Sequence, residues 1–236
     1  MEYLEKQQIF NAQVQNVRML NQAFAAIVRQ INSQIRKGDE VGICLSTRLL
    51  LLTFDAWSEA TFSKMIHSTG AFESSELIDI KACAARNIID GWHKCIGICF
   101  EKAKNHTSIE TIEYARSFVQ KSISEDIVSS RRLRNKIAHG QWQVALNRSN
   151  DDIDHALTLS LQNLDPVEII KLRERQMIVS QLVEDLVESP GKAFPRDCWN
   201  HYNKLREYIA RSDAWTLVTK RSQLNLKTKS LRAKTV

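Results

Sequence analysis

Helix-breaking residues are scarce in this sequence, and their scarcity restricts the folds that the chain can adopt. Only 7 glycines and 3 prolines occur among its 236 residues. An all-β fold needs frequent turns, and turns depend heavily on these two residue types. Hydrophobic residues make up 43% and charged residues 25% of the chain, which is ordinary for a globular protein with its own core. The sequence therefore predicts long helices packed into an all-α fold.

The clearest helical pattern lies near the N-terminus. Two series of mostly apolar residues recur at seven-residue spacing. The first series is Phe10, Val17, Phe24 and Ile31, and the second is Val14, Asn21, Val28 and Ile35. Together they form one seam along a helix, which we expect to end at Gly38 because glycine readily takes the left-handed conformation that caps helices. Asn21 is the polar member of the seam. It fits either a register-setting position in a coiled coil or the wet edge of a bundle helix.

Similar periodicity and capping signals predict the other helices. We expect them over residues 41–66, 75–104, 107–122, 124–140, 165–188 and 196–211. Thr107 and Glu110 have the spacing of a capping box at one start. Asp165 and Pro166 mark another start, because aspartate caps a helix and proline suits its first turn. No internal repeat or linker interrupts this pattern, so we expect a single helical domain over residues 1–219.

Residues 141–161 have a different pattern, in which apolar and polar residues alternate. The alternating apolar residues are Trp142 and Val144, and then Leu157, Leu159 and Leu161. The turn-rich stretch 147–154 separates the two groups. Period-two alternation around a polar loop is typical of a small β-hairpin, or of extended arms packed on the helices. Both interpretations place non-helical structure directly after the charged segment described below.

The formal net charge of +6 resides in the C-terminal tail. Residues 220–236 contain six lysines and arginines and no acidic residue. We expect this tail to be flexible, and it fits either binding to a polyanion such as RNA or a frayed, solubilising chain end. Any affinity of residues 1–219 for nucleic acid must then come from local clusters of charge.

The cysteine pattern and hydropathy predict the cellular compartment. Five cysteines form no disulfide framework, no signal peptide precedes them, and no apolar run approaches the ~20 residues that a membrane span needs. We therefore expect a soluble cytoplasmic protein that does not enter the membrane. His93, Cys95 and Cys99 lie within seven residues, but their spacing fits no standard zinc site, and buried structural cysteines are the simpler interpretation. We expect no metal site and no cofactor.

One charged segment, residues 131–140, contains side chains suited to chemistry on a phosphodiester. Asn135 and His139 are four residues apart and would share a helix face. Arg134 would lie about 140° around the helix from His139, although its long side chain could swing over if Gly140 unwinds the helix end. Histidine moves protons near neutral pH, and arginine binds phosphate and stabilises a pentavalent transition state. The alternatives are a histidine that interacts with the helix dipole and a solvated basic face.

Residues 134–140, with the sequence RNKIAHG, resemble the Arg-x4–6-His signature of HEPN-type ribonucleases, including the polar residue directly after the arginine. The resemblance implies an antiparallel helical bundle that forms a homodimer and brings two such motifs into one cleft. It also implies metal-independent cleavage of RNA, in which the ribose 2′-hydroxyl is the nucleophile and a 2′,3′-cyclic phosphate remains. Many members are toxins or antiviral-defence effectors, so an antitoxin or another regulatory protein is an expected partner.

The resemblance also implies roles for individual residues. His139 would be the general acid–base, Arg134 would bind and stabilise the scissile phosphate, and Asn135 would orient the site. Members of this type often add an acidic residue from an earlier helix. Glu59 is the candidate because it lies in an otherwise apolar helix, and its alternative is an ordinary exposed glutamate. The neighbouring phosphate contacts would be Arg131, Arg132 and Lys136.

One departure from the family pattern concerns regulation. HEPN toxins that a nucleotidyltransferase partner silences usually have a tyrosine two residues after the histidine, where this chain has Gln141. The departure argues against control by modification at this position. The alternative function is a non-catalytic helical scaffold or regulatory module, which would bind RNA or a partner protein through the N-terminal seam and the basic tail.

Overall fold

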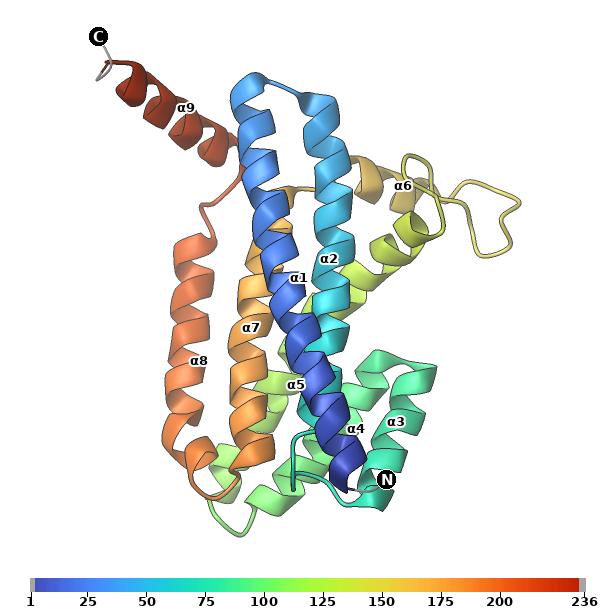
Figure 1. Cartoon of the computed structure of the whole chain (residues 1–236), viewed down its shortest axis with the longest axis vertical. Helices are drawn as coiled ribbons and strands as arrows, with labels where there is room; N and C mark the ends of the chain where they lie inside the picture. Colours follow the sequence, from blue (N-terminus) through green and yellow to red (C-terminus); the bar gives the residue numbers. More distant parts are fainter. Residues whose placement is uncertain (1–2, 234–236) are drawn as a thin grey trace. The chain divides into compact units, whose positions relative to one another are not determined.

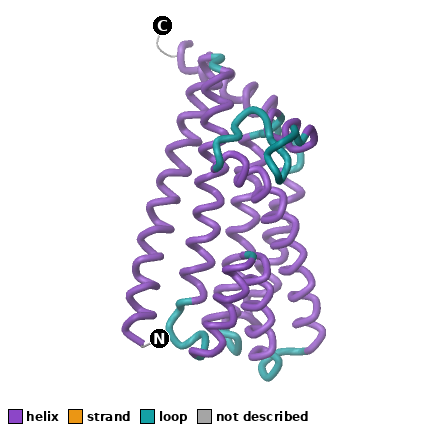
Figure 2. Tube along the Cα trace, turned by 90° about the vertical axis from the view of Figure 1, so that its right-hand side faces the viewer, coloured by secondary structure: helices purple, strands orange, loops and turns teal. Residues whose placement is uncertain are grey.

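The computed structural model describes residues 3–233, and the side chains of these residues except 3, 128, 129 and 227–233. Within the described residues the protein is all-α, as predicted, with nine helices and no strand (Figure 2). The helices are α1 (Tyr3–Lys37), α2 (Glu40–Ile66), α3 (Ser74–Arg86), α4 (Ile88–Ala103), α5 (Ile109–Ala138), α6 (His155–Gln162), α7 (Pro166–Glu188), α8 (Ala193–Ser212) and α9 (Leu217–Ala233).

The chain divides into two compact units, each assembled from three separate stretches. Unit 1 consists of Met1–Met19, Trp57–Ser129 and Arg173–Ala210. Unit 2 consists of Leu20–Ala56, Ser130–Leu172 and Arg211–Val236. Five helices, α1, α2, α5, α7 and α8, therefore contribute to both units. The single domain expected over residues 1–219 stays a prediction, because neither unit is a continuous piece of chain.

Several helix boundaries follow the local signals in the sequence. Helix α1 ends before Gly38, which has a φ of 69°, the left-handed conformation that glycine adopts without strain. Helix α7 begins at Pro166, where the Asp165 carboxylate accepts a hydrogen bond of 2.7 Å from the backbone N–H of Val167. These boundaries confirm the prediction that glycine, proline and aspartate at these positions terminate or start helices.

Unit 1 has an apolar core formed by α2, α3, α4, α5, α7 and α8. Its largest fully buried side chains include Trp92, Phe100 and Phe194. The Phe62 ring lies 4.9 Å from the Trp92 ring, and Phe100 meets Phe194 edge to face at 5.8 Å between centroids. Figure 1 shows α7 and α8 side by side, and the His201 ring of α8 lies 2.8 Å from the Asp185 carboxylate of α7. Burial of these large aromatic rings stabilises this unit together with the buried aliphatic side chains around them.

The helices of unit 1 differ from the prediction at two points. The expected helix over 75–104 is two helices, because Asn87 adopts an extended conformation and caps α4 by accepting a hydrogen bond from the N–H of Ile89. The two helices expected over 107–122 and 124–140 are one, α5. Its apolar residues keep a spacing of three or four across the expected break, so nothing interrupts the buried face; they are Ile112, Ala115, Val119, Ile123 and Ile127.

The contact between α3 and α4 depends on Gly91. A Cβ atom at this position would lie 2.5 Å from the Ala84 Cβ and 2.9 Å from its Cα. We expect Gly91→Ala to lower the free energy of unfolding by about 1 kcal/mol, because overpacking by about 2 kcal/mol outweighs a helix-propensity gain of about 1 kcal/mol. A Cβ atom at Gly97 would meet no atom within 4 Å, so Gly97→Ala should instead raise the free energy of unfolding by about 0.5–1 kcal/mol. Urea denaturation measures both, and equal stabilities would contradict this close approach.

Unit 2 contains the region where a β-hairpin was expected, and that expectation is wrong. Residues 141–161, all of which the structure describes, form no strand. Their only β-type pairing is an isolated bridge between Leu146 and Ile153. Residues 155–162 form helix α6 instead, because the Asp154 side chain caps it through the N–H of Leu157 at 2.9 Å. Leu161 is buried whereas Leu159 is 59% exposed, so the alternating leucines do not share one buried face.

The basic tail begins inside a helix. Helix α9 spans Leu217–Ala233 and so includes most of residues 220–236. Arg221 forms a two-pronged ion pair with Glu40 at the start of α2, with distances of 2.5 and 2.6 Å. Because both side chains are substantially exposed, this pair contributes little to stability. The expected flexibility and RNA affinity of the tail stay predictions.

One helix among the described residues, α2, is long and apolar enough to cross a membrane by length and composition alone. Of the most apolar stretch of 18 residues in α2, 56% is buried inside the protein. A core helix passes the same test, and Leu50 and Leu51 of α2 are buried, whereas Leu45 and Leu49 are exposed. The evidence for a membrane span is therefore weak.

Candidate functional site

The end of helix α5 positions His139. The N–H of Gly140 donates to the carbonyl of Ile137, and the N–H of Gln141 donates to the carbonyl of Lys136 at 2.9 Å. With a φ of 81° at Gly140, this pair of bonds is a Schellman cap, which satisfies the last carbonyls of the helix. His139 is the last residue before the left-handed glycine, and its side chain is exposed. The local sequence Ala-His-Gly thus ends the helix and leaves the imidazole accessible.

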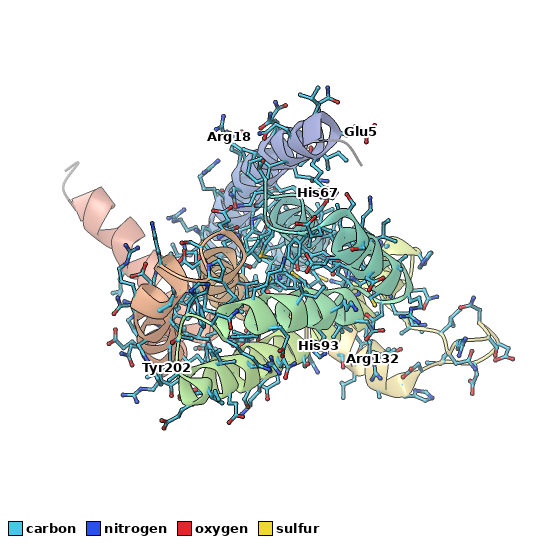
Figure 3. The ribbon with its side chains drawn as sticks, turned by 90° about the horizontal axis from the view of Figure 1, so that it is seen from below. Glu5, Arg18, His67, His93, Arg132 and Tyr202 are labelled. Atoms are coloured by element: carbon cyan, nitrogen blue, oxygen red, sulfur yellow. The ribbon has the colours of Figure 1, made fainter. Side chains whose placement is uncertain are left out.

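His139 lines a cleft in unit 2 with a volume of about 1450 Å³. One wall is the end of α5, and the other consists of the loop after it and the start of α6. The lining residues are Arg132, Asn135, Lys136, His139, Gly140, Gln141, Leu146, Asn147, Arg148, Asn150, Asp154, Ala156, Leu157 and Ser160. Asn135 and His139, four residues apart on α5, both face this cleft. Figure 3 labels Arg132, which is exposed at the surface.

The charge of the cleft lining is mainly positive. Arg132, Lys136 and Arg148 contribute cations, and Asp154 contributes the one carboxylate among the lining residues. The Asp154 carboxylate accepts a hydrogen bond from the first turn of α6, and this contact uses part of its capacity to bind a cation. A cleft with this excess of cations attracts phosphate groups.

Arg134 has a different environment from the residues of the cleft lining. Its Nε atom lies 2.6 Å from Oδ2 of Asp55, a buried carboxylate on α2, and its Nη1 donates to the side chain of Asn135 at 3.1 Å. Arg134 is not among the residues that line the cleft. In the single chain, Arg134 and His139 therefore do not meet in one cleft. The angular separation of about 140° on the helix accounts for this, because Asp55 holds the arginine on its own side.

Lys136 connects α5 with the loop that follows it. Its Nζ makes a short hydrogen bond to the carbonyl of Leu146, while Gln141 accepts a hydrogen bond of 2.8 Å from the N–H of the same residue. The loop closes on itself through the N–H of Asn147, which donates to the carbonyl of Asp152 at 2.8 Å. These contacts give the outer wall of the cleft a defined shape, and they give Lys136 a structural contact in addition to the expected phosphate contact.

A buried arginine of α2 holds both ends of the cleft-forming segment. Arg48 is only 3% exposed. Its Nε donates to the carbonyl of Trp142 at 2.6 Å, and its Nη2 donates to the carbonyl of Leu161 at 3.3 Å. Nη1 donates to the carbonyl of Cys44 within α2 at 2.9 Å. The guanidinium group thus attaches the start of the loop and the end of α6 to the same helix.

The remaining predicted site residues lie outside the cleft lining. Glu59 is half-buried and belongs to unit 1, one helical turn after Asp55. Arg131 is half-buried at the end of α5 and does not line the cleft. Sequence reasoning missed Asp55, although the signal that selected Glu59, an acid in an apolar helix, applies equally to it. Arg148 was missed because nothing in the sequence marks its loop as the wall of a cleft.

The cysteine and histidine cluster of α4 lies in unit 1. Cys95 and Cys99 are buried in the core, and the hydrogen-bonding interaction of the Cys95 thiol with Cys99, together with burial, raises the pKa of Cys95 well above its usual value. His93 lies 3.3 Å from the Ser124 hydroxyl. Among the described residues no group of three or more His, Cys, Asp and Glu side chains could hold a metal ion. The two cysteines act as core residues.

No protein-family model, curated protein or solved structure matches this chain. The functional argument therefore rests on the residues of the cleft and on the motif at the end of α5.

Proposed function

We propose that this protein is a metal-independent endoribonuclease of the HEPN type, and that the cleft at the end of α5 is its active site. The observation that carries the proposal is the exposed imidazole of His139 in a cleft lined by Arg132, Lys136 and Arg148. The resemblance of residues 134–140 to the HEPN signature points to the same chemistry. We further propose a homodimeric, cytoplasmic toxin or antiviral-defence effector, restrained by an antitoxin or another regulatory protein.

The proposed reaction is an internal transesterification. The ribose 2′-oxygen forms a bond to phosphorus, the bond from phosphorus to the 5′-oxygen breaks, and a 2′,3′-cyclic phosphate remains. One proton leaves the 2′-hydroxyl and one reaches the departing 5′-oxygen. His139 is suited to one of these transfers, and the cationic side chains would stabilise the extra negative charge of the pentavalent phosphorus.

The balance of protons requires a second proton-transfer group, and a dimer would provide one. A single imidazole cannot act as base and acid in the same step, so the second transfer needs another group. His139 of a second copy would supply it, as the resemblance implies. For Arg134 to contact the scissile phosphate, its side chain must turn from Asp55, or the phosphate must be held between two chains.

The test is cleavage of total RNA by the purified full-length protein in the presence of EDTA, followed by analysis of the RNA ends. We expect fragments with 2′,3′-cyclic phosphate and 5′-hydroxyl ends, at a rate unchanged by the chelator. A reaction that stops on chelation, or ends that carry 5′-phosphate, would contradict the proposed chemistry.

One observation favours the alternative of a non-catalytic scaffold or regulatory module. Arg134, the residue that the resemblance assigns to phosphate binding, is held by a buried carboxylate as a structural ion pair would be. A scaffold would bind RNA or a partner protein through the N-terminal seam and the basic tail. Deletion of residues 220–236 separates the two functions, because it should abolish the binding that a scaffold makes through its tail and leave cleavage at His139 in place.

A further inference from the structure

We propose that the loop between α5 and α6 is an RNA-binding arm, that Arg148 is its phosphate contact, and that the cleft takes a short single-stranded segment of RNA. This inference rests on the proposed function and names the substrate class of the same site. It assigns a role to a residue that the motif does not include. The argument uses the structure of the loop, the charge of the cleft and its size.

The loop presents Arg148 on a turn that is fixed by its own hydrogen bonds. Asn147 accepts a bond from the N–H of Asp151 at 3.3 Å and donates from its amide to the Asp151 carboxylate at 2.7 Å. Asn150 has a φ of 59°, a left-handed conformation that asparagine tolerates and that completes the turn. Arg148 lies inside this turn, is exposed, and lines the cleft. Because the turn is already fixed, Arg148 can contact a phosphate without the entropy cost of ordering the loop when RNA binds.

The charges across the cleft suit a phosphate chain. Arg132 and Lys136 approach from α5, and Arg148 approaches from the loop, so cations line both walls. The acids nearest to Arg148 in sequence, Asp151 and Asp152, do not line the cleft. Asp152 accepts a hydrogen bond of 2.7 Å from the N–H of Ile153. A backbone that passes between two cationic walls can contact both through successive phosphates.

The size and lining of the cleft indicate several nucleotides of one strand. Its volume of about 1450 Å³ exceeds the roughly 300–1000 Å³ of a small-molecule pocket. Proteins that bind duplex RNA span about 16 base pairs and two minor grooves, far more than one helix end and one loop. No Phe, Tyr or Trp is among the residues that line this cleft, and His139 has its only aromatic ring, so phosphate contacts outnumber stacking contacts. If the three cations of the cleft each contact one phosphate of a single strand, the logarithm of the association constant should fall with the logarithm of the salt concentration with a slope of about −2.

The test measures binding by full-length protein that carries His139→Ala, so that the RNA stays intact. Fluorescence anisotropy with an eight-nucleotide single strand, between 50 and 200 mM salt, yields the affinity and its salt slope. Arg148→Gln in this background should reduce the steepness of the slope by about 0.7 and weaken binding about five-fold at 0.1 M salt. The matched control is Arg29→Gln, an exposed arginine of α1 in unit 2 that does not line the cleft. It should change neither quantity.

The results separate this inference from the proposed function. An unchanged slope for Arg148→Gln, or tighter binding of an eight-base-pair RNA duplex than of the eight-nucleotide single strand in the same assay, overturns the RNA-binding arm. If the slope falls as expected while the parent protein never cleaves RNA, the arm is supported and the endoribonuclease is wrong. If the parent cleaves RNA, and Arg148→Gln made in the parent protein cleaves like the parent, the enzyme stands. The arm is then overturned if Arg148→Gln in the His139→Ala background also binds like that background.

Discussion

Replacing His139 by alanine should slow RNA cleavage by about 100- to 10,000-fold, the contribution that a positioned general acid or base makes. The fold should survive, because the side chain is exposed and the hydrogen bonds of the helix cap come from the backbone. We expect the free energy of unfolding to change by less than about 1 kcal/mol. The measurement is the rate at which cyclic phosphate ends form in EDTA, with urea denaturation of the same samples.

The matched control for this substitution is His155→Ala. His155 is exposed in unit 2 at the first residue of α6, next to lining residues of the cleft but not one of them. The His155→Ala variant should cleave RNA at the rate of the parent protein. If His139→Ala retains the parent rate, the proton is transferred by another group and the proposed mechanism fails. If both substitutions reduce the rate equally, the effect is a general one on unit 2 and not chemistry at His139.

Replacing Arg134 by glutamine should lower the free energy of unfolding by about 2–4 kcal/mol. The substitution takes the guanidinium group from the buried Asp55 carboxylate, and breaking such a pair from one side is strongly destabilising. The double variant Asp55→Asn, Arg134→Gln should lose less free energy of unfolding than the sum of the losses in the two single variants. The difference, the coupling energy, should be about 1–3 kcal/mol. Urea denaturation of the parent, both single variants and the double variant at neutral pH measures this coupling.

Arg132→Gln is the control, because Arg132 is an exposed arginine of the same helix, two residues earlier. It should change stability by less than about 0.5 kcal/mol. Additive effects of the Asp55 and Arg134 substitutions would mean that the ion pair does not contribute to folding. Cleavage per folded molecule then decides the role of Arg134: a double variant that still cleaves makes Arg134 structural, whereas one that folds and does not cleave supports its contact with phosphate.

The fold could be predicted where the signal was local. Gly38 ends α1, and Asp165 with Pro166 starts α7, because each depends on the conformation or capping of a few adjacent residues. The break at Asn87 was missed because its apolar neighbours keep helical periodicity on both sides. Helix α6 was mistaken for a strand because three leucines alternate with polar residues in so short a stretch, and a single capping aspartate outweighs that alternation.

The site could be predicted only along one helix. The spacing of Asn135 and His139 placed both on one face, and both line the cleft. The partners of this helix come from elsewhere in the chain: Asp55 and Arg48 lie on α2, and Arg148 lies on the loop beyond α5. Periodicity within a helix contains no information on which other helix its faces meet, so neither the ion pair of Arg134 nor the attachment of the loop by Arg48 could be read from it.

By itself, the sequence determined the all-helical class, the ends of several helices and a histidine at the end of a basic helix. These features depend on backbone conformation and side-chain spacing over a few residues. Only the tertiary structure decided that Arg134 turns to a buried carboxylate while His139 faces a cationic cleft. That choice depends on the charge and burial of residues some eighty positions away in the chain, which act on Arg134 only after the helices have packed.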